Sequence, residues 1–419
     1  MKQKSSRFKE FYHKSHSERL KKIQNFAQLS DTEIDQLKQV QALSFKAANR
    51  MVENVITTMP LPLGIATNFI INNKDYVIPM ATEEPSVIAA ASYAAKLARE
   101  NNGFTATATL PIMIGQIQIT NIKYMHHAKE QITKHTQELI TIANKQDPIL
   151  ISVGGGMRNI ECREVHTSRG TMFLLHLLVN VQNAMGANIL NAMAEKITPR
   201  VEELTGGIVN LRIVSNLAIH RMVTARATWK KELIGKQTIE NILDAHALAV
   251  SDPYRCATHN KGVMNGIDAV VTATGNDVRA VEAGAHCFAS LSGNYKPLTH
   301  FEKNNDGDLV GTIELPLAVG ITGGVTQTHP VAKLALKIIG VKSAQELAQV
   351  IACVGLAQNF AALRALVNEG IQRGHMRLHS KNIAVSAGVQ NGDVEKIAQR
   401  MIDENNISVT HAHELLKQL

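Results

Sequence analysis

The sequence predicts a mixed α and β fold with two or three domains. Its 419 residues give that number at about 150 residues per domain. Between residues 110 and 215, strand and helix patterns alternate, as in a small α+β unit. After Trp229 helical patterns dominate. Hydrophobic residues make up 45% of the chain and charged residues 19%, so the chain can bury a sizeable core.

The N-terminal part combines short helices with one strand. Residues 6–50 read as short polar helices, with the S-x-x-E spacing of a capping box at 30–33. Residues 77–80 read as the end of a short strand. A helix is expected from Pro85, a residue that suits the first helical turn, to a stop at Gly103.

The rest of the chain alternates between strands and helices and then becomes helical. Alternating, β-branched patterns predict strands over residues 112–122, 170–181 and 208–213. A helix is expected over 184–205, ended by a glycine pair. A second capping-box spacing at 343–346 opens a long apolar helix through Ala365, and the tail 392–419 reads as a separate helical unit.

The net charge is concentrated at the N-terminus. Lys and Arg exceed Asp and Glu by 8, and the first 50 residues account for 6 of these charges, with 11 basic against 5 acidic side chains. Aromatic residues are 4%, with Trp229 as the single tryptophan. A nucleic-acid binder usually has more basic charge and more stacking aromatics, so we expect no nucleic-acid partner. The preferred interpretation of the basic segment is a set of solvated surface helices. The alternative is a tether to nucleic acid or another anionic surface.

Cysteine usage and hydropathy indicate a soluble, cytoplasmic protein. The four cysteines are far apart and form no C-x-x-C motif, which is typical of reduced thiols in the cytosol. The N-terminus has no apolar run of signal-peptide length. Because no stretch of about 18 consecutive apolar residues occurs, we expect no membrane-spanning segment.

Several familiar catalytic motifs are absent. The sequence contains no G-x-G-x-x-G fingerprint, no P-loop, no H-E-x-x-H and no G-x-S-x-G elbow. The pairs His126-His127 and His411/His413 lack a third ligand at metal spacing, so we expect no metal site.

Four polar clusters remain as candidate site segments. They lie at residues 82–86, 252–262, 274–277 and 373–376. In the first, Glu83 and Glu84 lie where a strand is followed by a helix. They are either acids that stabilise the helix start or a carboxyl group held beside an active-site cleft. In the second, Lys261 is either solvated or buried with a partner.

The other two clusters add an aspartate and a histidine. The preferred interpretation of Asp277 is a turn residue. The alternative is an acid at the end of a strand that includes 269–271. His375 follows a predicted helix stop, and a histidine there can exchange protons near neutral pH. Together with Glu84 and Lys261 they form a set able to donate protons and stabilise an oxyanion.

These clusters resemble the signature segments of class II 3-hydroxy-3-methylglutaryl-CoA (HMG-CoA) reductases, the soluble prokaryotic form, over nearly the whole chain. The matching segments are Glu53-Asn54-Val55-Ile56, Glu83-Glu84-Pro85-Ser86-Val87, Ala184-Met185-Gly186-Ala187-Asn188, Asp252-Pro253-Tyr254-Arg255, His259-Asn260-Lys261-Gly262, Met264-Asn265-Gly266-Ile267-Asp268, Ala273-Thr274-Gly275-Asn276-Asp277 and Glu369-Gly370-Ile371-Gln372-Arg373-Gly374-His375-Met376. Many segments in the same order make chance agreement implausible. The resemblance implies interconversion of HMG-CoA and mevalonate plus CoA by two successive hydride transfers, through hemithioacetal and mevaldehyde stages.

The resemblance implies a role for each candidate catalytic side chain. Lys261 matches the lysine that stabilises the oxyanion on the thioester and on the aldehyde. Glu84 matches the glutamate that protonates the mevaldehyde oxygen, and Glu83 is assigned no role. Asp277 matches the aspartate that bridges this lysine and glutamate. His375 matches the histidine of a mobile flap that protonates the departing CoA thiolate.

Substrate and cofactor residues are implied in the same way. Ser86 and Arg255 resemble residues that hold the hydroxymethylglutaryl group, and a guanidinium suits a carboxylate because it binds in a bidentate manner. Asn265 resembles an asparagine near the reacting carbonyl and the cofactor. The implied cofactor residues are Asp147, Met185, Gly186, Ala187, Asn188, Asn216 and Asn265, with the phosphates expected at the helix start over 184–188.

Asp147 favours NAD(H) over NADP(H). By its distance from the three glycines at 154–156, it matches an acid found in relatives that use NADH. A carboxylate accepts hydrogen bonds from the ribose 2′-hydroxyl but repels a 2′-phosphate. Asn183 departs from the pattern, since an aspartate is common at that position.

The resemblance also implies the domain organisation. Residues 1–109 and 216–374 correspond to a large domain for HMG-CoA binding and dimerisation, 110–215 to an inserted ferredoxin-like cofactor domain, and 375–419 to a C-terminal helical flap. Active sites of the family lie at a dimer interface, with the glutamate and lysine segments from different subunits. We therefore expect an obligate homodimer, alone or within a larger assembly.

Two alternatives stay open. One is an HMG-CoA reductase that prefers NADPH, and the other is a reductase of a different acyl-CoA. The sequence also leaves open whether the enzyme makes mevalonate or oxidises it.

Overall fold

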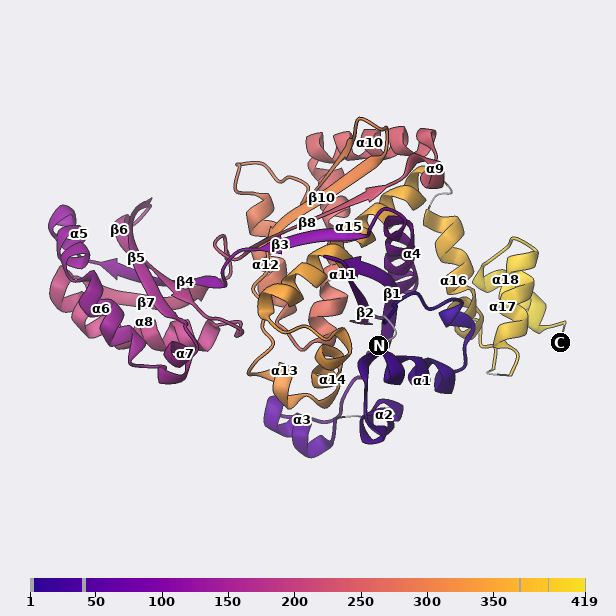
Figure 1. Cartoon of the computed structure of the whole chain (residues 1–419), viewed down its shortest axis with the longest axis horizontal. Coiled ribbons are helices and arrows are strands. Elements are labelled where there is room, and N and C mark those ends of the chain that lie inside the picture. Colours follow the sequence, from indigo (N-terminus) through magenta and orange to yellow (C-terminus); the bar gives the residue numbers. More distant parts are fainter. Residues whose placement is uncertain (1–3, 40–42, 369–370, 391, 419) are drawn as a thin grey trace.

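The computed structural model describes residues 4–39, 43–368, 371–390 and 392–418, and for 371–378 it describes the backbone only. These residues form two β-sheets with helices packed on them (Figure 1). The smaller sheet lies at one end of the molecule and the C-terminal helices at the other (Figure 1). The predicted mixed α and β fold is confirmed.

The larger sheet has six strands in the order β2-β1-β3-β8-β10-β9. Its strands are β1 (Leu63–Ile71), β2 (Lys74–Ala81), β3 (Phe104–Ala108), β8 (Met222–Trp229), β9 (Thr299–Lys303) and β10 (Leu309–Pro316). All neighbours are antiparallel except β1 and β3. The strands come from distant parts of the sequence because residues 112–215 are inserted between β3 and β8.

Three helices pack against this sheet and form the main core. They are α4 (Val87–Arg99), α11 (Pro253–Ala273) and α15 (Ala344–Asn368). Trp229 is fully buried at their contact, stacked on Phe360 with ring centroids 3.9 Å apart, and it donates a hydrogen bond to the Ala94 carbonyl. A buried indole with its N–H satisfied fixes α4 and α15 on the sheet.

The smaller sheet is an antiparallel four-stranded sheet in the order β5-β6-β4-β7. Its elements are β4 (Ile112–Thr120), α5 (Met125–Lys134), α6 (Thr136–Asn144), α7 (Pro148–Ser152), β5 (Gly156–Thr167), β6 (Gly170–Asn180), α8 (Ala187–Thr205) and β7 (Ile208–Ser215). This β-α-β-β-α-β arrangement is ferredoxin-like. The expected strands over 112–122, 170–181 and 208–213 and the expected helix over 184–205 are all present.

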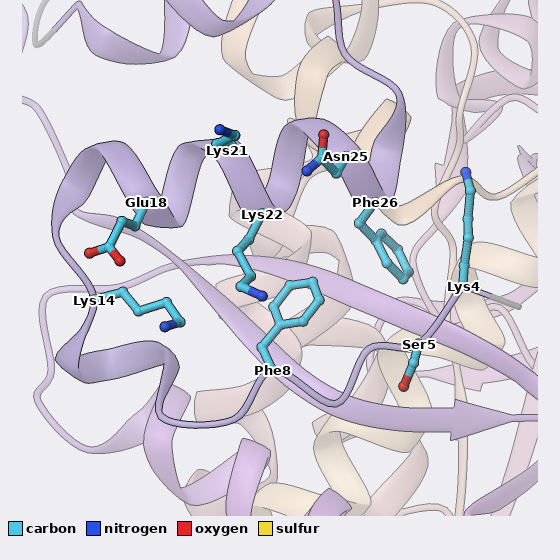
Figure 2. Close-up of a pocket in the computed structure, with 9 residues that line it drawn as sticks. All are labelled: Lys4, Ser5, Phe8, Lys14, Glu18, Lys21, Lys22, Asn25 and Phe26. Carbon is cyan, nitrogen blue, oxygen red and sulfur yellow. The ribbon is translucent and has the colours of Figure 1, made fainter. Parts of the chain in front are cut away.

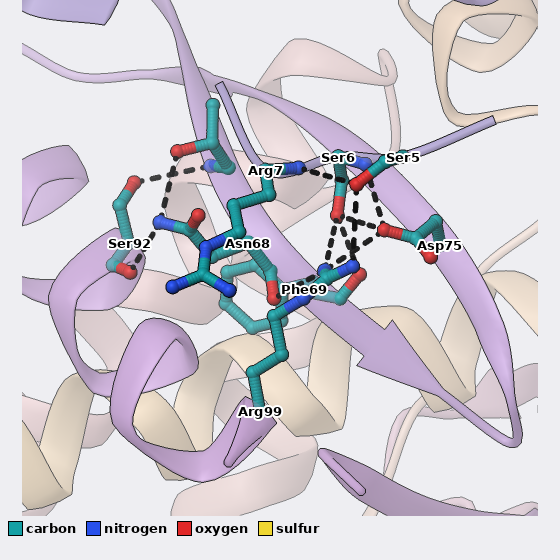
Figure 3. A network of polar contacts seen from close by, with 9 residues as sticks. Ser5, Ser6, Arg7, Asn68, Phe69, Asp75, Ser92 and Arg99 are labelled. Atoms are coloured by element: carbon teal, nitrogen blue, oxygen red, sulfur yellow. Dashed lines mark hydrogen bonds and ion pairs between the residues drawn. The ribbon is translucent and has the colours of Figure 1, made fainter. Parts of the chain in front are cut away.

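The N-terminal helices are held on the larger sheet. They are η1 (Phe11–His13), α1 (His16–Ala27), α2 (Asp31–Lys38) and α3 (Phe45–Met51), and the predicted capping box between Ser30 and Glu33 is formed. Ahead of them, buried Ser6 donates from its N–H and hydroxyl to Asp75 at 2.7 and 2.6 Å, and Arg99 pairs with the same carboxylate at 2.8 Å (Figure 3). This network ties the basic N-terminal segment to β2 and α4.

The remaining helices complete the larger unit and the C-terminus. They are α9 (Lys231–Ile234), α10 (Lys236–Ser251), α12 (Val278–Ala289), α13 (Val325–Thr328), α14 (Pro330–Ile339), α16 (Ile371–Ser386), α17 (Val394–Asp403) and α18 (Val409–Leu416). The last three share a small apolar core around Met401. The expected separate helical tail therefore includes α16 as well as the residues from 392 onward.

The start of α15 corrects a detail of the sequence prediction. The Ser343 hydroxyl accepts from the Glu346 N–H at 3.1 Å, but the Glu346 carboxylate accepts from the Lys342 N–H and binds Lys74 and Tyr76. The predicted capping box is thus only half formed, because Glu346 joins α15 to β2 instead.

Helix α15 bears on the expectation about membrane-spanning segments. By length and mean hydropathy its 25 residues are apolar enough to cross a membrane. However, 67% of its most apolar window is buried inside the protein, as is typical of a core helix. Its apolar character is explained by its packing against the sheet.

Candidate active site

Glu84 lies in the turn between β2 and α4, where the sequence predicted the change from strand to helix. The Thr82 hydroxyl accepts from the Glu84 N–H at 3.2 Å. Ser86 takes a left-handed conformation with φ of 78° at the helix start, which turns the chain sharply into α4. Glu84 and Ser86 line a cavity of about 1300 Å³ between this turn and the N-terminal segment.

Lys261 and Asn265 both reach the Glu84 carboxylate from α11. Lys261 Nζ lies 3.0 Å from Glu84 Oε2, and Asn265 Nδ2 donates to the same oxygen at 3.3 Å. The two residues are four apart on one helix, so they share a face. An Asp252 cap and a proline in the first turn start this helix, a signal that would have placed both residues on one helix from sequence alone.

The residues before Lys261 are locked into the core. His259 is buried, with Nε2 2.7 Å from the Thr299 hydroxyl, and its carbonyl accepts from Asn359 Nδ2 at 3.0 Å. Asn260 is fully buried, donates to the Lys296 carbonyl and accepts from the Leu298 N–H. A helix held by buried hydrogen bonds on both sides presents the lysine in a fixed position.

The ion pair itself is accessible to water in the single chain. The Lys261 side chain is 60% exposed and the Glu84 side chain 31%. An exposed ion pair of this kind contributes only about 0–1 kcal/mol to stability. Excluding water from this pair would strengthen the interaction of the lysine with a negatively charged oxygen.

Asp277 lies at the other end of α11. It follows a turn at Gly275 (φ of 69°) and caps α12, accepting from the Ala280 N–H at 3.2 Å, with Arg279 Nε 3.4 Å away. Residues 269–271 are helical, so the interpretation as a strand-end acid is wrong and the interpretation as a turn residue is right.

Within one chain, Asp277 does not reach the Lys261–Glu84 pair. Ala273, the last residue of α11, lies twelve positions after Lys261, which is about 18 Å along the helix, and a lysine side chain spans only about 6 Å. The expectation that the glutamate and lysine come from different subunits is wrong for this pair, because a single chain supplies both.

Arg255 also lies away from the pair. It is six positions before Lys261 on α11, so it projects about 120° from Lys261 around the helix. Burial lowers the pKa of its guanidinium. Among the described residues, no carboxylate forms an ion pair with this guanidinium. His375 lies on α16, but its side chain is outside the described residues.

The predicted phosphate segment forms the start of α8, a helix of 19 residues. Gly186 is its N-cap, with φ of 106°, and no side chain caps the first turn. The first backbone N–H groups therefore point towards any anion placed there, flanked by Met185, Ala187 and Asn188. Asn191, in the second turn of α8, accepts from the Val214 N–H at 3.0 Å, which brings the end of β7 and the following Asn216 to the same edge.

Asp147 caps the short helix α7, accepting from the Leu150 N–H at 2.8 Å through Oδ1. The chain then returns to the sheet through Gly155, where a Cβ would lie 2.8 Å from the Asn180 carbonyl. Only glycine permits this approach. Because Asn180 ends the strand that leads to Gly186, Asp147 and the start of α8 are connected to the same edge of the small sheet.

The side chains described by the structure contain no group of three or more His, Cys, Asp or Glu residues that could hold a metal ion. All four cysteines are free thiols. The chemistry available at the site therefore comes from a lysine, a carboxyl group and amides beside a large cavity, with a separate anion-binding helix start.

Comparisons with known proteins agree with this arrangement. Residues 15–380 match the family model of hydroxymethylglutaryl-coenzyme A reductase. A 3-hydroxy-3-methylglutaryl-coenzyme A reductase of Archaeoglobus fulgidus is 53% identical over 99% of this chain and 95% of its own. The chain therefore belongs to the HMG-CoA reductase family of oxidoreductases, which use a nicotinamide cofactor.

Solved structures place the chain more narrowly within the family. A class II HMG-CoA reductase from Streptococcus pneumoniae, described as bound to NADPH in open conformations, is 39% identical with a TM-score of 0.82, over 97% of this chain and 99% of that one. A second structure of the reductase from that organism is 38% identical with a TM-score of 0.84, over 98% and 99%. The chain is thus a class II, prokaryotic-type HMG-CoA reductase of mevalonate metabolism.

Proposed function

We propose that the protein converts HMG-CoA to mevalonate and CoA with two equivalents of NADH, through hemithioacetal and mevaldehyde stages. The observation that carries this proposal is the convergence of Lys261 and Asn265 on the Glu84 carboxylate beside the large cavity. The cofactor supplies a hydride in each of the two reductions. The protein must therefore stabilise negative charge on oxygen twice and supply protons.

Each side chain has one task in this scheme. Lys261 and Asn265 face the oxygen that becomes negative when the thioester, and later the aldehyde, is reduced. Glu84 donates a proton to the aldehyde oxygen in the second reduction. Ser86, on the rim of the same cavity, holds the hydroxymethylglutaryl group. His375 protonates the CoA thiolate as it leaves, so that the thiolate does not return to the aldehyde.

The positions of these residues support a homodimer with shared active sites. Asp277 lies just past the C-terminal end of α11, as does the proposed cofactor edge, which is the edge of the small sheet near Asp147 and the start of α8. Lys261 and Glu84 lie about 18 Å back from that end along the helix. A second chain in a twofold arrangement brings its own Asp277, Arg255 and cofactor edge to the pair. It also covers the exposed lysine. In this scheme 1–109 and 216–374 bind substrate, 110–215 binds the cofactor, and 375–419 closes the site.

The N-terminal segment supplies a place for the phosphorylated end of the substrate. Next to the large cavity lies a second one of about 620 Å³, and Phe8 lines both. Lys4, Lys14, Lys21 and Lys22 line the second cavity with Glu18 as its one acid, and Figure 2 shows Lys14 and Lys22 reaching in beside Phe8. An acyl-CoA with its acyl group at Glu84 would place its phosphates among these lysines.

NADH is the preferred cofactor in this proposal because of Asp147. Its carboxylate stands at the cofactor edge and would repel a 2′-phosphate. Asn183 does not oppose this preference, since its side chain accepts from the Ala344 N–H at 2.9 Å and has a structural task. The Streptococcus pneumoniae relative is described with NADPH, so the alternative is an NADPH-preferring enzyme.

The test is an initial-rate assay in which HMG-CoA and either NADH or NADPH are mixed with the protein. We expect oxidation of two cofactor molecules per mevalonate, faster with NADH. A panel of other acyl-CoAs separates this activity from that of a reductase with a different substrate. The absence of oxidation with HMG-CoA would refute the proposal. We further propose a cytoplasmic location, where CoA thioesters and reduced cofactor are available.

A further inference from the structure

We infer that Arg221 is a positioning residue that fixes the cofactor-binding turn against the part of the chain that carries Asp277. The inference rests on the proposed function, because it assigns the turn at 184–186 to the nicotinamide cofactor. Arg221 lies in the connection between β7 and β8, outside every segment that the sequence singled out.

Arg221 is a buried cation whose recorded side-chain partners are backbone carbonyls. Its side chain is 5% exposed, and burial lowers its pKa to about 10. Nη1 donates to the carbonyls of Ala184 and Met185, both at 3.1 Å, and Nη2 donates to the carbonyl of Val319. A buried guanidinium is costly unless its donors are satisfied, so these three bonds hold the two segments together.

A second set of contacts fastens the same turn. The Asn183 carbonyl accepts from the N–H groups of Ile321 and Thr322, at 2.9 and 3.3 Å. At Gly320 a Cβ would lie 2.6 Å from the Met185 nitrogen, so the two backbones touch there. The turn is thus held both by Arg221 and by residues 320–322, directly before the start of α8.

The clamp continues to the catalytic aspartate segment. The Gly320 N–H donates to Asn276 Oδ1 at 2.7 Å, and Asn276 Nδ2 donates to the Thr274 hydroxyl at 3.0 Å. Asn276 directly precedes Asp277. A chain of direct contacts therefore runs from the phosphate-binding turn, through Val319 and Gly320, to the residue beside Asp277.

The geometry requires an arginine. Three acceptors from two separate segments surround one planar guanidinium, whose fixed fork matches them. A lysine at this position keeps the charge but presents one compact ammonium group, so it can donate to only some of the three carbonyls. A methionine of similar length leaves three carbonyls unpaired in a buried place. We therefore expect the native arginine to hold the turn best, the Arg221→Lys variant to hold it less well and the Arg221→Met variant least.

The experiment compares Arg221→Met and Arg221→Lys with Arg226→Met, a matched control. Arg226 is an exposed arginine of β8 whose recorded ion pair is a loose one, with Glu302 at 3.8 Å. We expect Arg221→Met to raise KM for NADH by about tenfold or more, with KM for HMG-CoA changed less than about twofold. Arg221→Lys should lie between it and the wild type. Arg226→Met should leave both constants unchanged.

A second measurement separates the clamp from the proposed reaction. NADH binding is followed by fluorescence titration without HMG-CoA, so it does not depend on turnover. If wild-type protein binds NADH but does not reduce HMG-CoA, the proposed function fails while the weaker binding of Arg221→Met still supports the clamp. Unchanged NADH binding in Arg221→Lys and in Asn276→Ala, each with a thermal midpoint near that of the wild type, would overturn the inference. Equal changes in both KM values would also overturn it.

Discussion

Lys261 Nζ lies 3.0 Å from Glu84 Oε2, and both residues belong to the same chain. The lysine comes from the middle of a core helix and the glutamate from a sharp turn between a strand and a helix. Because Asn265 donates to the same carboxylate oxygen, one acid faces both groups that would stabilise the substrate oxyanion. In the proposed reaction, the substrate carbonyl oxygen takes the place of that contact.

Replacing Lys261 should abolish most turnover. We expect Lys261→Ala to lower kcat by a factor on the order of 100 to 1000, because an oxyanion loses its fixed cation. Its effect on stability should be within about 1 kcal/mol, since the pair is exposed. The matched control is Lys303→Ala, which removes an exposed lysine paired with Glu240 at 2.5 Å. Steady-state rates and thermal midpoints of both variants check this, and comparable losses of kcat in the two would contradict it.

The sequence predicted the members of this cluster mainly through the order of the matching segments along the chain. Local helix and strand patterns predicted less of it. The strand-to-helix turn at Glu84 follows from the apolar pattern of 77–80 and the proline after the glutamate. Contact between positions 84 and 261 does not follow, because it depends on how α4 and α11 pack on the sheet. Nor does the position of Asp277 beyond the far end of α11, because the apolar residues 269–271 fit a strand as well as a helix.

The clamp at Arg221 had no signal in the sequence. A single arginine between two strands looks like a surface residue, and only the packing of Val319 and Gly320 against the turn at 184–186 shows that it is buried. Nor did the sequence show that the Asn183 side chain accepts from the N–H of the first residue of α15.

A complementation experiment tests whether two chains share each active site. Lys261→Ala and Asp277→Asn homodimers should each be nearly inactive. In a randomly mixed population, half of the dimers are mixed and one of their two sites is intact, so we expect about a quarter of wild-type activity. Co-expression or refolding of the two variants together, followed by a rate assay, gives this number.

The control for complementation pairs two residues of the same chain. Lys261→Ala mixed with Glu84→Gln should recover no activity, because one chain supplies both groups to a site and each site in a mixed dimer lacks one of them. Recovery in this control as well as in the first mixture would show that sites are not divided as proposed. A wild-type protein that is a fully active monomer on a sizing column would exclude shared sites altogether.

Asp147 should set the choice between the two nicotinamide cofactors. We expect Asp147→Asn to lower the ratio of kcat/KM for NADH to that for NADPH by about tenfold, since the repulsion of a 2′-phosphate is removed. The amide oxygen can still cap α7, where Oδ1 now accepts from the Leu150 N–H, so the fold should hold. Asp244→Asn, on α10, serves as the control. An unchanged ratio in Asp147→Asn would remove this residue from cofactor selection.

The basic cavity should affect the use of HMG-CoA and not of the cofactor. We expect Lys14→Glu/Lys22→Glu to raise KM for HMG-CoA about tenfold or more, with a smaller effect at high salt, because phosphate contacts are screened. KM for NADH should not change. The control is Lys38→Glu/Lys46→Glu, two exposed lysines of α2 and α3 outside the cavity. If KM for HMG-CoA rises equally in the cavity variant and in the control variant, the cavity does not bind the phosphorylated end of the substrate.

Buried histidines next to the site should make the fold sensitive to acid. Burial lowers the pKa of His259 to about 3 and that of His246 to about 4, whereas an exposed histidine has a pKa near 6.5. These groups remain neutral in the folded protein, so their contribution to stability is complete above pH 6.5. As pH falls from there towards 4, the unfolded chain takes up protons that the folded chain does not, and the free energy of unfolding decreases.

For His259 this decrease approaches about 1.4 kcal/mol per pH unit, the limit for one proton. His246 faces His300 at 3.4 Å and the Phe301 ring, so His246→Leu fits an apolar setting and removes one of the two titrations. We expect urea denaturation between pH 7 and 5 to show a smaller loss of stability in this variant than in the wild type. His126→Leu, at a side chain 87% exposed, should keep the wild-type slope. Identical slopes in all three proteins would mean that the buried imidazoles are protonated in the folded state.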